Sequence, residues 1–307
     1  MINREEYEKY ISELTKKDVN NPNLKYVSKG YKSSAGVMMT VGIIMLFVGF
    51  FGTIILSIIG AVLFGFGIFR MVKVGSAQKY YKENYSKKVL DFLLKDNDYT
   101  FDEFGKIEEY IFKNSQMGTT NHYDYYKGED LLSINIPNDD GSKSNNYLHL
   151  CDLDVTKIES DSDGDDREVT VYKGVFGYVD FPFEFKCSMS INTTYRKPGV
   201  KFEKISLEDI VFNKKFKVLS NDQIESRYIL TPEMMEKLLI LNEKAGKVRL
   251  VLVDDKMYFG FSSIDLFELK SVSNNNVESL FDNFYTHVSV ILSIVNEIKN
   301  NNKIFKI

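Results

Sequence analysis

The chain has 307 residues, with 39 Lys and Arg against 43 Asp and Glu, which gives a formal net charge of -4 at pH 7. No basic block or basic-aromatic stripe accompanies this small acidic excess, so the composition excludes nucleic acid as an expected partner. The two cysteines, Cys151 and Cys187, form no CxxC pair. We expect a cytoplasmic chain to keep both of them reduced, without a disulfide.

Residues 1–34 predict a short cytoplasmic helix followed by a linker. Asn3 is suited to cap a helix over residues 3–17, because Glu6 follows three residues later as in a capping box. The Asn- and Pro-rich residues 20–23 end that helix.

Residues 35–69 contain no charged side chain. One straight helix of this length would extend about 50 Å, whereas the hydrocarbon core of a bilayer is roughly 30 Å thick. Two helices, 35–51 and 53–69, fit better if the chain folds back at the glycines of residues 49–52. We therefore predict a transmembrane helical hairpin. A re-entrant or interfacial pair is the alternative, because about 17 residues is short for a full crossing.

Basic residues flank both ends of this apolar run, whereas the turn between the helices has no charge. They are Lys25, Lys29 and Lys32 before it, and Arg70, Lys73 and Lys79 after it. Basic residues next to membrane spans stay in the cytoplasm, so we expect a multi-pass protein with both termini cytoplasmic and the lipid bilayer as its first partner. A secretory signal peptide would start earlier and have an apolar stretch of only about 7–15 residues.

Small residues recur every fourth position in the second predicted span, at Thr53, Ser57, Ala61 and Gly65. Such spacing lets membrane helices approach closely. The contact is either with the first helix of the same hairpin or with another copy or a partner. The hairpin has no ionisable residue, which argues against a transporter.

Residues 70–98 predict a juxtamembrane stalk helix that continues the second span, because their apolar residues have helical spacing. Residues 99–307 then predict a cytoplasmic α+β domain. It begins with a short helix around 101–114 and continues with strands at 132–136, 147–151, 169–172, 176–185 and 212–219.

Thr231 as N-cap and Pro232 at the first helical position predict a helix that extends to about residue 244. A β-hairpin of strands 248–253 and 257–261 follows, and the spacing of apolar residues predicts a last helix over 277–298. Helices, then strands, then helices favour the α+β class, with an antiparallel sheet and helices packed on one face.

Acidic residues, histidines and cysteines, which form catalytic and metal sites in many proteins, are present, but they lack the spacing that such sites require. The acidic stretch 159–166 fits the first half of a calcium-binding EF-hand loop, but Thr170 stands where a bidentate glutamate is needed. We interpret it as a solvated turn, and weak divalent-ion binding is the alternative.

His149, Cys151 and Cys187 lack the usual spacing of zinc ligands. Nothing fixes the mutual geometry of His122 and the acids up to Asp130. We therefore predict no catalytic, metal-binding or cofactor-binding residue, and no cofactor.

The segment 211–232 has two phenylalanines, Phe212 and Phe216, ahead of the sequence Arg-Tyr-Ile-Leu-Thr-Pro that opens a helix. This pattern resembles the signature of a bacterial membrane-protein family known as domain of unknown function 3137. The resemblance implies a membrane hairpin ahead of the domain, and it implies a LemA-like membrane protein as a partner. It supplies no catalytic residues. Arg227 is the position to which we assign either a structural ion pair with Glu225 or Asp222, or recognition of a partner carboxylate or lipid phosphate.

These features together predict a bacterial inner-membrane protein that binds or scaffolds other proteins. A second membrane protein or another copy of the chain is the expected partner. The alternatives are a membrane-proximal enzyme and a self-assembling two-span channel or transport accessory protein. We favour binding over enzymatic activity, because no constellation of catalytic residues is visible.

Overall fold

The computed structural model describes residues 3–18, 21, 23–138, 140–160, 165–193, 195, 197–262, 281–301 and 304–305. The chain divides into two compact units. The first comprises residues 1–93 and 267–285, and the second comprises residues 94–266 and 286–307.

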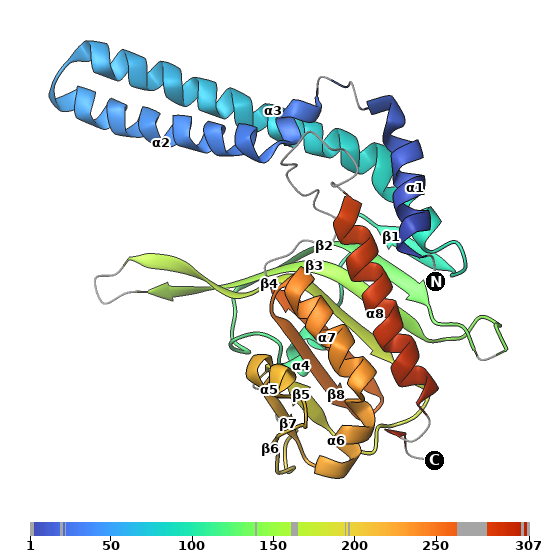
Figure 1. The fold of residues 1–307 in the computed structure, drawn as a ribbon. Helices are drawn as coiled ribbons and strands as arrows, with labels where there is room; N and C mark the ends of the chain where they lie inside the picture. Colours follow the sequence, from blue (N-terminus) through green and yellow to red (C-terminus); the bar gives the residue numbers. More distant parts are fainter. Residues whose placement is uncertain are drawn as a thin grey trace. The chain divides into compact units, whose positions relative to one another are not determined.

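The first unit is helical (Figure 1), with α1 (Arg4–Thr15), α2 (Lys29–Phe51), α3 (Ile54–Leu93) and two short turns, η1 (Lys16–Asp18) and η2 (Leu24–Val27). The Asn3 side chain accepts a hydrogen bond of 2.7 Å from the Glu6 amide, which confirms the predicted cap. Helix α2 starts earlier than predicted, because Ser28 caps it and accepts from the Tyr31 amide. Helix α3 continues without a break through the charged residues, so the second apolar helix and the predicted stalk are one helix.

Aromatic side chains form the packed part of the first unit. Tyr7 of α1 donates a hydrogen bond of 2.7 Å to the carbonyl of Phe281, whose ring also lies 5.7 Å from that of Tyr85 in α3. Tyr10 and Phe92 stack with their ring centroids 3.9 Å apart. The predicted apolar face of the stalk is buried in this unit.

Within the described residues, the second unit contains a nine-stranded sheet in the order β1-β2-β3-β4-β9-β8-β5-β7-β6, and every pair is antiparallel. The strands are β1 (Tyr99–Asp102), β2 (Tyr125–Asn135), β3 (Tyr147–Ser160), β4 (Asp166–Asp180), β5 (Met189–Ile191), β6 (Glu203–Ile205), β7 (Val218–Ser220), β8 (Val248–Val253) and β9 (Lys256–Ser262). This arrangement confirms the predicted α+β class with an antiparallel sheet and flanking helices.

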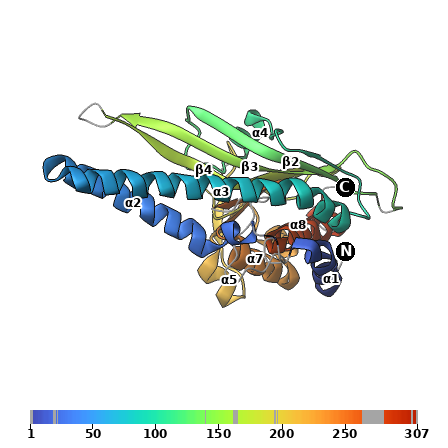
Figure 2. The same ribbon diagram turned by 90° about the horizontal axis from the view of Figure 1, so that it is seen from above.

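Helices cover both faces of the sheet (Figure 2). Helices α7 (Pro232–Ala245) and α8 (Asp282–Asn300) pack on one face, where Leu238 and Ile291 meet Leu250 and Phe259. Helix α4 (Glu109–Ser115) lies on the opposite face, and its Phe112 joins a core cluster with residues that include Cys151. The prediction of helices on one face alone was therefore incomplete.

The prediction of a strand over 212–219 was wrong in its first half. The Asp209 carboxylate accepts hydrogen bonds from the amides of Val211 and Phe212, at 2.7 and 2.9 Å, and so caps α5 (Ile210–Lys215). An N-cap of this kind starts a helix even where the apolar pattern also suits a strand. Helix α6 (Gln223–Ile229) follows β7 and has a similar cap, from Asp222.

Other element boundaries also differ from the predicted ones, and the strands predicted at 132–136 and 147–151 are the longer β2 and β3. The predicted helix around 101–114 divides into β1 and α4, and the predicted strands 169–172 and 176–185 form the single strand β4, which ends at Asp180. The last helix starts at Asp282, and the predicted residues 277–280 lie outside the described residues.

Candidate functional site

Glycines set the distance between α2 and α3. A Cβ atom added to Gly60 would lie 2.8 Å from the carbonyl oxygen of Gly42 and 2.7 Å from the backbone nitrogen of Leu46. A Cβ atom added to Gly49 would lie 2.5 Å from the hydroxyl of Ser57. The two backbones approach so closely that no larger residue fits at these positions.

The four small residues predicted as a packing stripe do not share this contact. Ser57 is half-buried against α2, whereas Thr53, Ala61 and Gly65 are exposed. A Cβ atom on Gly65 would meet nothing within 4 Å. Ala61 and Gly65 therefore lie on an outward face of α3, and the small residues that meet α2 are Ser57, Gly60 and Gly67.

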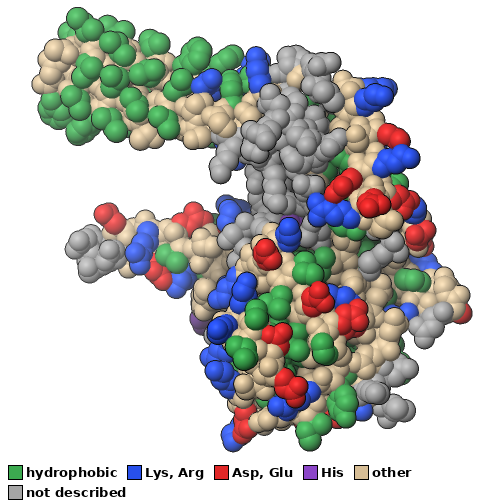
Figure 3. Space-filling model, viewed as in Figure 1, with side chains coloured by type: hydrophobic (Ala, Val, Ile, Leu, Met, Phe, Trp, Pro, Cys, Tyr) green, Lys and Arg blue, Asp and Glu red, His purple; other side chains and the backbone are tan. Residues whose placement is uncertain are grey.

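The outward surface of the hairpin is apolar over both helices. Phe47 and Phe50 of α2 are 69% and 83% exposed, and Ile54 of α3 is 79% exposed. Figure 3 shows hydrophobic side chains covering this arm, with Lys and Arg only toward its base. The segments Gly30–Phe51 and Ile54–Leu93 are long and apolar enough to cross a membrane.

Basic and aromatic side chains gather at the open end of the hairpin. The Arg70 guanidinium donates to the Ser34 hydroxyl at 2.8 Å and lies 4.2 Å from the ring centroid of Tyr31. Residues 19–82 include seven Lys and Arg but no Asp or Glu. The closed end, at Gly52 and Thr53, has no charge.

Arg227 is exposed in α6 and makes a local structural contact. Its guanidinium donates to the carbonyl oxygens of Gln223 at 3.2 Å and Ser206 at 3.3 Å. It makes no ion pair with Glu225 or Asp222 within the described residues, so the structural role differs from the one predicted. The Asp222 carboxylate instead caps α6. The recognition role of Arg227 stays a prediction.

The histidines and cysteines do not come together as a metal site. Cys151 is fully buried beneath α4, and the Cys187 thiol lies 4.0 Å from the Ser226 hydroxyl. His149 Nδ1 lies 2.8 Å from the Ser133 hydroxyl, and the ring stacks on Tyr178. Within the described residues, no group of three or more His, Cys, Asp and Glu could hold a metal ion.

The polar segments noted in the sequence are dispersed in the structure. The Asp124 carboxylate accepts from the Ile158 amide at 2.6 Å, whereas Asp130 is buried at a bulge in β2. Residues 161–164 of the acidic stretch lie outside the described residues, and next to them Glu159 pairs with Arg167 at 3.0 Å.

A cleft of about 320 Å³ lies at the end of the sheet where β2 and β3 are connected. We call it the aromatic cleft. Its apolar wall consists of Phe181, Pro182, Phe183 and Phe305, and its polar wall consists of Asn138, Asn146 and Lys299. Sequence reasoning missed this site. The dense phenylalanines of residues 176–185 were the available signal, but Asn146 and Lys299 are far from them in the sequence.

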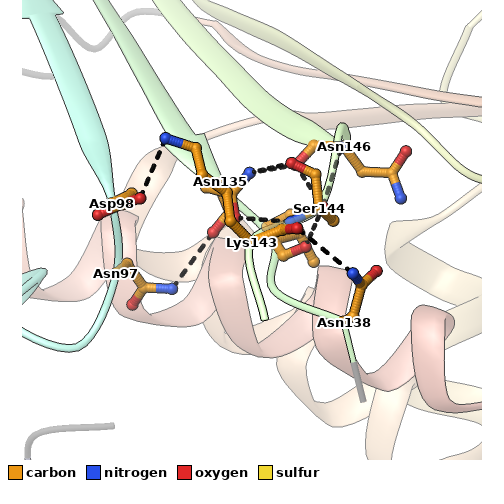
Figure 4. A network of polar contacts seen from close by, with 8 residues as sticks. Asn97, Asp98, Asn135, Asn138, Lys143, Ser144 and Asn146 are labelled. Carbon is orange, nitrogen blue, oxygen red and sulfur yellow. Dashed lines mark hydrogen bonds and ion pairs between the residues drawn. The ribbon is translucent and has the colours of Figure 1, made fainter. Parts of the chain in front are cut away.

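A hydrogen-bond network stiffens the β2–β3 connection beside the cleft (Figure 4). The Asn135 amide donates to the carbonyl of Ser144 at 2.8 Å, and the Ser144 hydroxyl donates to that of Ile136 at 2.5 Å. Lys143 forms an ion pair with Asp98 at 3.1 Å. The side-chain amide of Asn146 points away from this network and, within the described residues, makes no hydrogen bond.

Comparisons with known proteins identify a family without an assigned activity. No curated protein matches the sequence. The crystal structure of the mycobacterial trehalose monomycolate transport factor A, TtfA, is similar at a TM-score of 0.34 and 8% sequence identity, over 67% of this chain and 91% of that chain. A likeness of this degree assigns neither fold nor function. The model of the family described as "Protein of unknown function (DUF3137)" matches residues 170–300. The matched residues, 170–300, include the signature predicted at 211–232, so this region of the chain is similar to the family described as DUF3137, which confirms the predicted resemblance.

Proposed function

We propose that this chain is a multi-pass protein of the bacterial inner membrane, anchored by α2 and α3, with both termini in the cytoplasm. The observation that carries the proposal is the outward surface of the hairpin, where large apolar side chains of both helices are exposed. Keeping such surface in water costs about 25 cal/mol per Å². A lipid bilayer around the hairpin removes this cost along all of the charge-free residues 35–69.

The orientation follows from the difference between the two ends of the hairpin. The open end has Arg70 and its neighbouring lysines, and the closed end at Gly52 has no charge. Basic residues resist translocation, which supports an orientation with the open end and both termini in the cytoplasm. The ring of Tyr31 lies beneath the Arg70 guanidinium, and tyrosine is a residue type that is enriched at the interface between lipid and water.

The α+β domain in this proposal is a cytoplasmic module that binds or scaffolds a membrane protein, either a LemA-like protein or a second copy of the chain. The exposed small residues Ala61 and Gly65 support a partner inside the membrane, because a further helix can approach α3 closely there. Both faces of the sheet are occupied by helices, so a protein partner of the domain would use its loops, edges or exposed helices.

Cysteine accessibility in intact cells tests the topology. The native Cys151 and Cys187 are buried, so single added cysteines at Gly52 and at Lys79 report on the two ends of the hairpin. A membrane-impermeant maleimide is expected to label Gly52→Cys from outside and to label Lys79→Cys only after the membrane is opened. Labelling of Lys79→Cys in intact cells, or release of the protein by alkaline washing, would contradict the anchored arrangement.

Purification from native membranes in mild detergent tests the binding role. We expect a stoichiometric membrane protein or a second copy to accompany the chain. Arg227→Gln is expected to weaken a contact that uses the Arg227 recognition role, and Arg167→Gln is the matched control because Arg167 is also an exposed arginine. A single copy without any partner would overturn the scaffold proposal.

A further inference from the structure

We propose that the aromatic cleft is a binding site for a small aromatic monocarboxylate. This inference goes beyond the proposed anchor and scaffold function, and it depends neither on the membrane topology nor on a protein partner. Pockets that bind small molecules are mostly apolar clefts of about 300–1,000 Å³ with a few well-placed polar groups. The aromatic cleft, at about 320 Å³, has that size, and four of its seven described lining residues are apolar.

The apolar wall favours an aromatic ligand. The ring of Phe305 lies 5.6 Å from that of Phe181 and 6.2 Å from that of Phe183. Phe183 is 58% exposed, so part of its ring is available to a ligand. Phe181 and Phe305 are each only 5% exposed, so Phe183 offers the ring surface, and a ligand ring against it gains from an offset or edge-to-face contact in addition to the burial of apolar area.

The backbone holds this wall in place. Phe305 pairs with Phe185 through a β-bridge, and the Lys186 amide donates to the carbonyl of Ile304 at 2.8 Å. The Phe181 amide donates to the carbonyl of Asp255 at 2.7 Å in the turn between β8 and β9. Two segments far apart in the sequence are therefore fixed against each other before any ligand binds, which lowers the cost of binding.

The polar wall supplies donors for one carboxylate. Lys299 Nζ donates to the carbonyl of Pro137 at 2.6 Å, which positions the ammonium group at the cleft. Asn146 lines the same cleft, and its side chain has an NH2 donor. An ammonium and an amide that line one cleft can each donate to an oxygen of a carboxylate, and hydrogen bonds to a charged group are the stronger ones.

The local charge favours a monoanion over a dianion. Asp140 on the same connection is fully exposed, and hydrogen bonds from Ser142, with a smaller effect of Lys299, hold the pKa of its carboxyl below the usual value. Among the described residues that line the cleft, Lys299 is the one charged group, so the cleft supplies a single cation for a single carboxylate.

The chain lacks tryptophan, so Phe183→Trp provides a single fluorescent reporter in the cleft wall. The experiment titrates this variant, in nanodiscs of zwitterionic lipid at pH 7, with 4-bromophenylacetate and with its neutral amide. Bromine quenches tryptophan only on close contact. We expect saturable quenching by the acid, with an affinity about tenfold or more above that of the amide.

The decisive variant is Phe183→Trp combined with Lys299→Met. We expect it to bind the acid about tenfold more weakly and the amide unchanged, whereas Lys299→Arg keeps the preference for the acid. Lys113→Met, an exposed lysine on α4, is the control for a general loss of positive charge. Phe104→Trp, at a position that is 89% exposed in the wild-type chain, is the control for non-specific quenching.

Each of the following results would overturn the proposal. They are an absence of saturable quenching in a Phe183→Trp variant whose thermal unfolding is unchanged, equal affinity for the acid and the amide, and unchanged affinity for the acid in Lys299→Met. Equal quenching of the Phe104→Trp reporter would also overturn it, because the probe would then only be partitioning into lipid or onto the surface.

Discussion

Lys237 Nζ lies 2.6 Å from Glu297 Oε2 and so joins α7 to α8 on the face of the sheet that both helices cover. The side chains of Lys237 and Glu297 are only 19% and 17% exposed. The Thr231 hydroxyl donates to the other carboxylate oxygen of Glu297 at 2.7 Å. Both carboxylate oxygens of Glu297 are thus paired. Because Thr231 also caps α7, this small polar cluster fixes the start of α7 against α8.

Replacing Lys237 by methionine is expected to lower the free energy of unfolding by about 1–3 kcal/mol, because the half-buried Glu297 loses its cation. Urea unfolding followed by circular dichroism measures this change. Lys215→Met, at an exposed position on α5, should stay within about 0.5 kcal/mol of wild type. In Lys237→Met/Glu297→Met much of the loss should be recovered, and a double variant no more stable than Lys237→Met would contradict the role of the unpaired carboxylate.

Gly60→Leu is expected to separate α2 from α3, since even a Cβ atom there would lie 2.7 Å from the Leu46 backbone nitrogen. Spin labels at the exposed positions Lys32 and Lys73 report the spacing of the two helices. Gly65→Leu is the matched control, because its side chain enters open space. We expect a broadened and longer distance distribution for Gly60→Leu alone. An unchanged distribution would show that the glycine contact does not determine the packing.

The native cysteines are expected to resist alkylation in the folded chain. Burial raises the pKa of the Cys151 thiol to about 12, and burial also raises that of Cys187. The reactive thiolate is therefore scarce at pH 8, and access is blocked as well. Mass spectrometry after maleimide treatment should show no addition until urea unfolds the α+β domain. Rapid labelling without denaturant would argue against the described burial of these residues.

His149 predicts a loss of stability on acidification. Burial lowers the pKa of its imidazole in the folded chain, with Asp180 as a smaller opposing effect. The unfolded chain, with a histidine pKa of about 6.5, therefore takes up the proton first as the pH falls. The stability contributed by neutral His149 is complete above about pH 6.5 and declines below it, until the folded form also protonates.

Thermal unfolding between pH 5 and pH 7.5 tests this dependence. His149→Gln keeps a polar group near Ser133 but cannot titrate, so its melting temperature should fall less across this range than that of the wild type. A parallel fall in both proteins would assign the effect to other groups. Nuclear magnetic resonance of the His149 ring measures the pKa directly and should place it below 6.5.

The sequence was sufficient where one local pattern decided the outcome. The charge-free residues 35–69 specify the apolar hairpin, and Thr231 with Pro232 specifies the start of α7, as the structure confirms. The prediction from sequence failed where two patterns competed. At residues 212–215, the Asp209 cap favours a helix and prevails over a strand-like run of apolar residues. The short strands β5 and β6, with three residues each, have too few residues for a period and exist through their neighbours in the sheet.

The aromatic cleft was beyond sequence reasoning for a different reason. Asn146 and Lys299 are more than 150 positions apart, and only the packing of α8 beside the β2–β3 connection brings them to one cavity. Single-chain patterns report periodicity along one element and carry no information on such distant pairs. The small-residue stripe shows the same limit, since spacing alone did not distinguish the face with Gly60 from the face with Gly65.

The unbroken course of α3 has a mechanical consequence in the anchored arrangement proposed above. Its 40 residues extend about 60 Å, and the 24 residues after Phe69 account for about 36 Å of that length. Membrane helices tilt to match bilayer thickness, and a change in tilt of about 10° would displace the far end of α3 by about 6 Å. Because α3 has no proline or break that could absorb the rotation, a change in bilayer thickness would, in the proposed arrangement, move the end of α3 that lies outside the membrane.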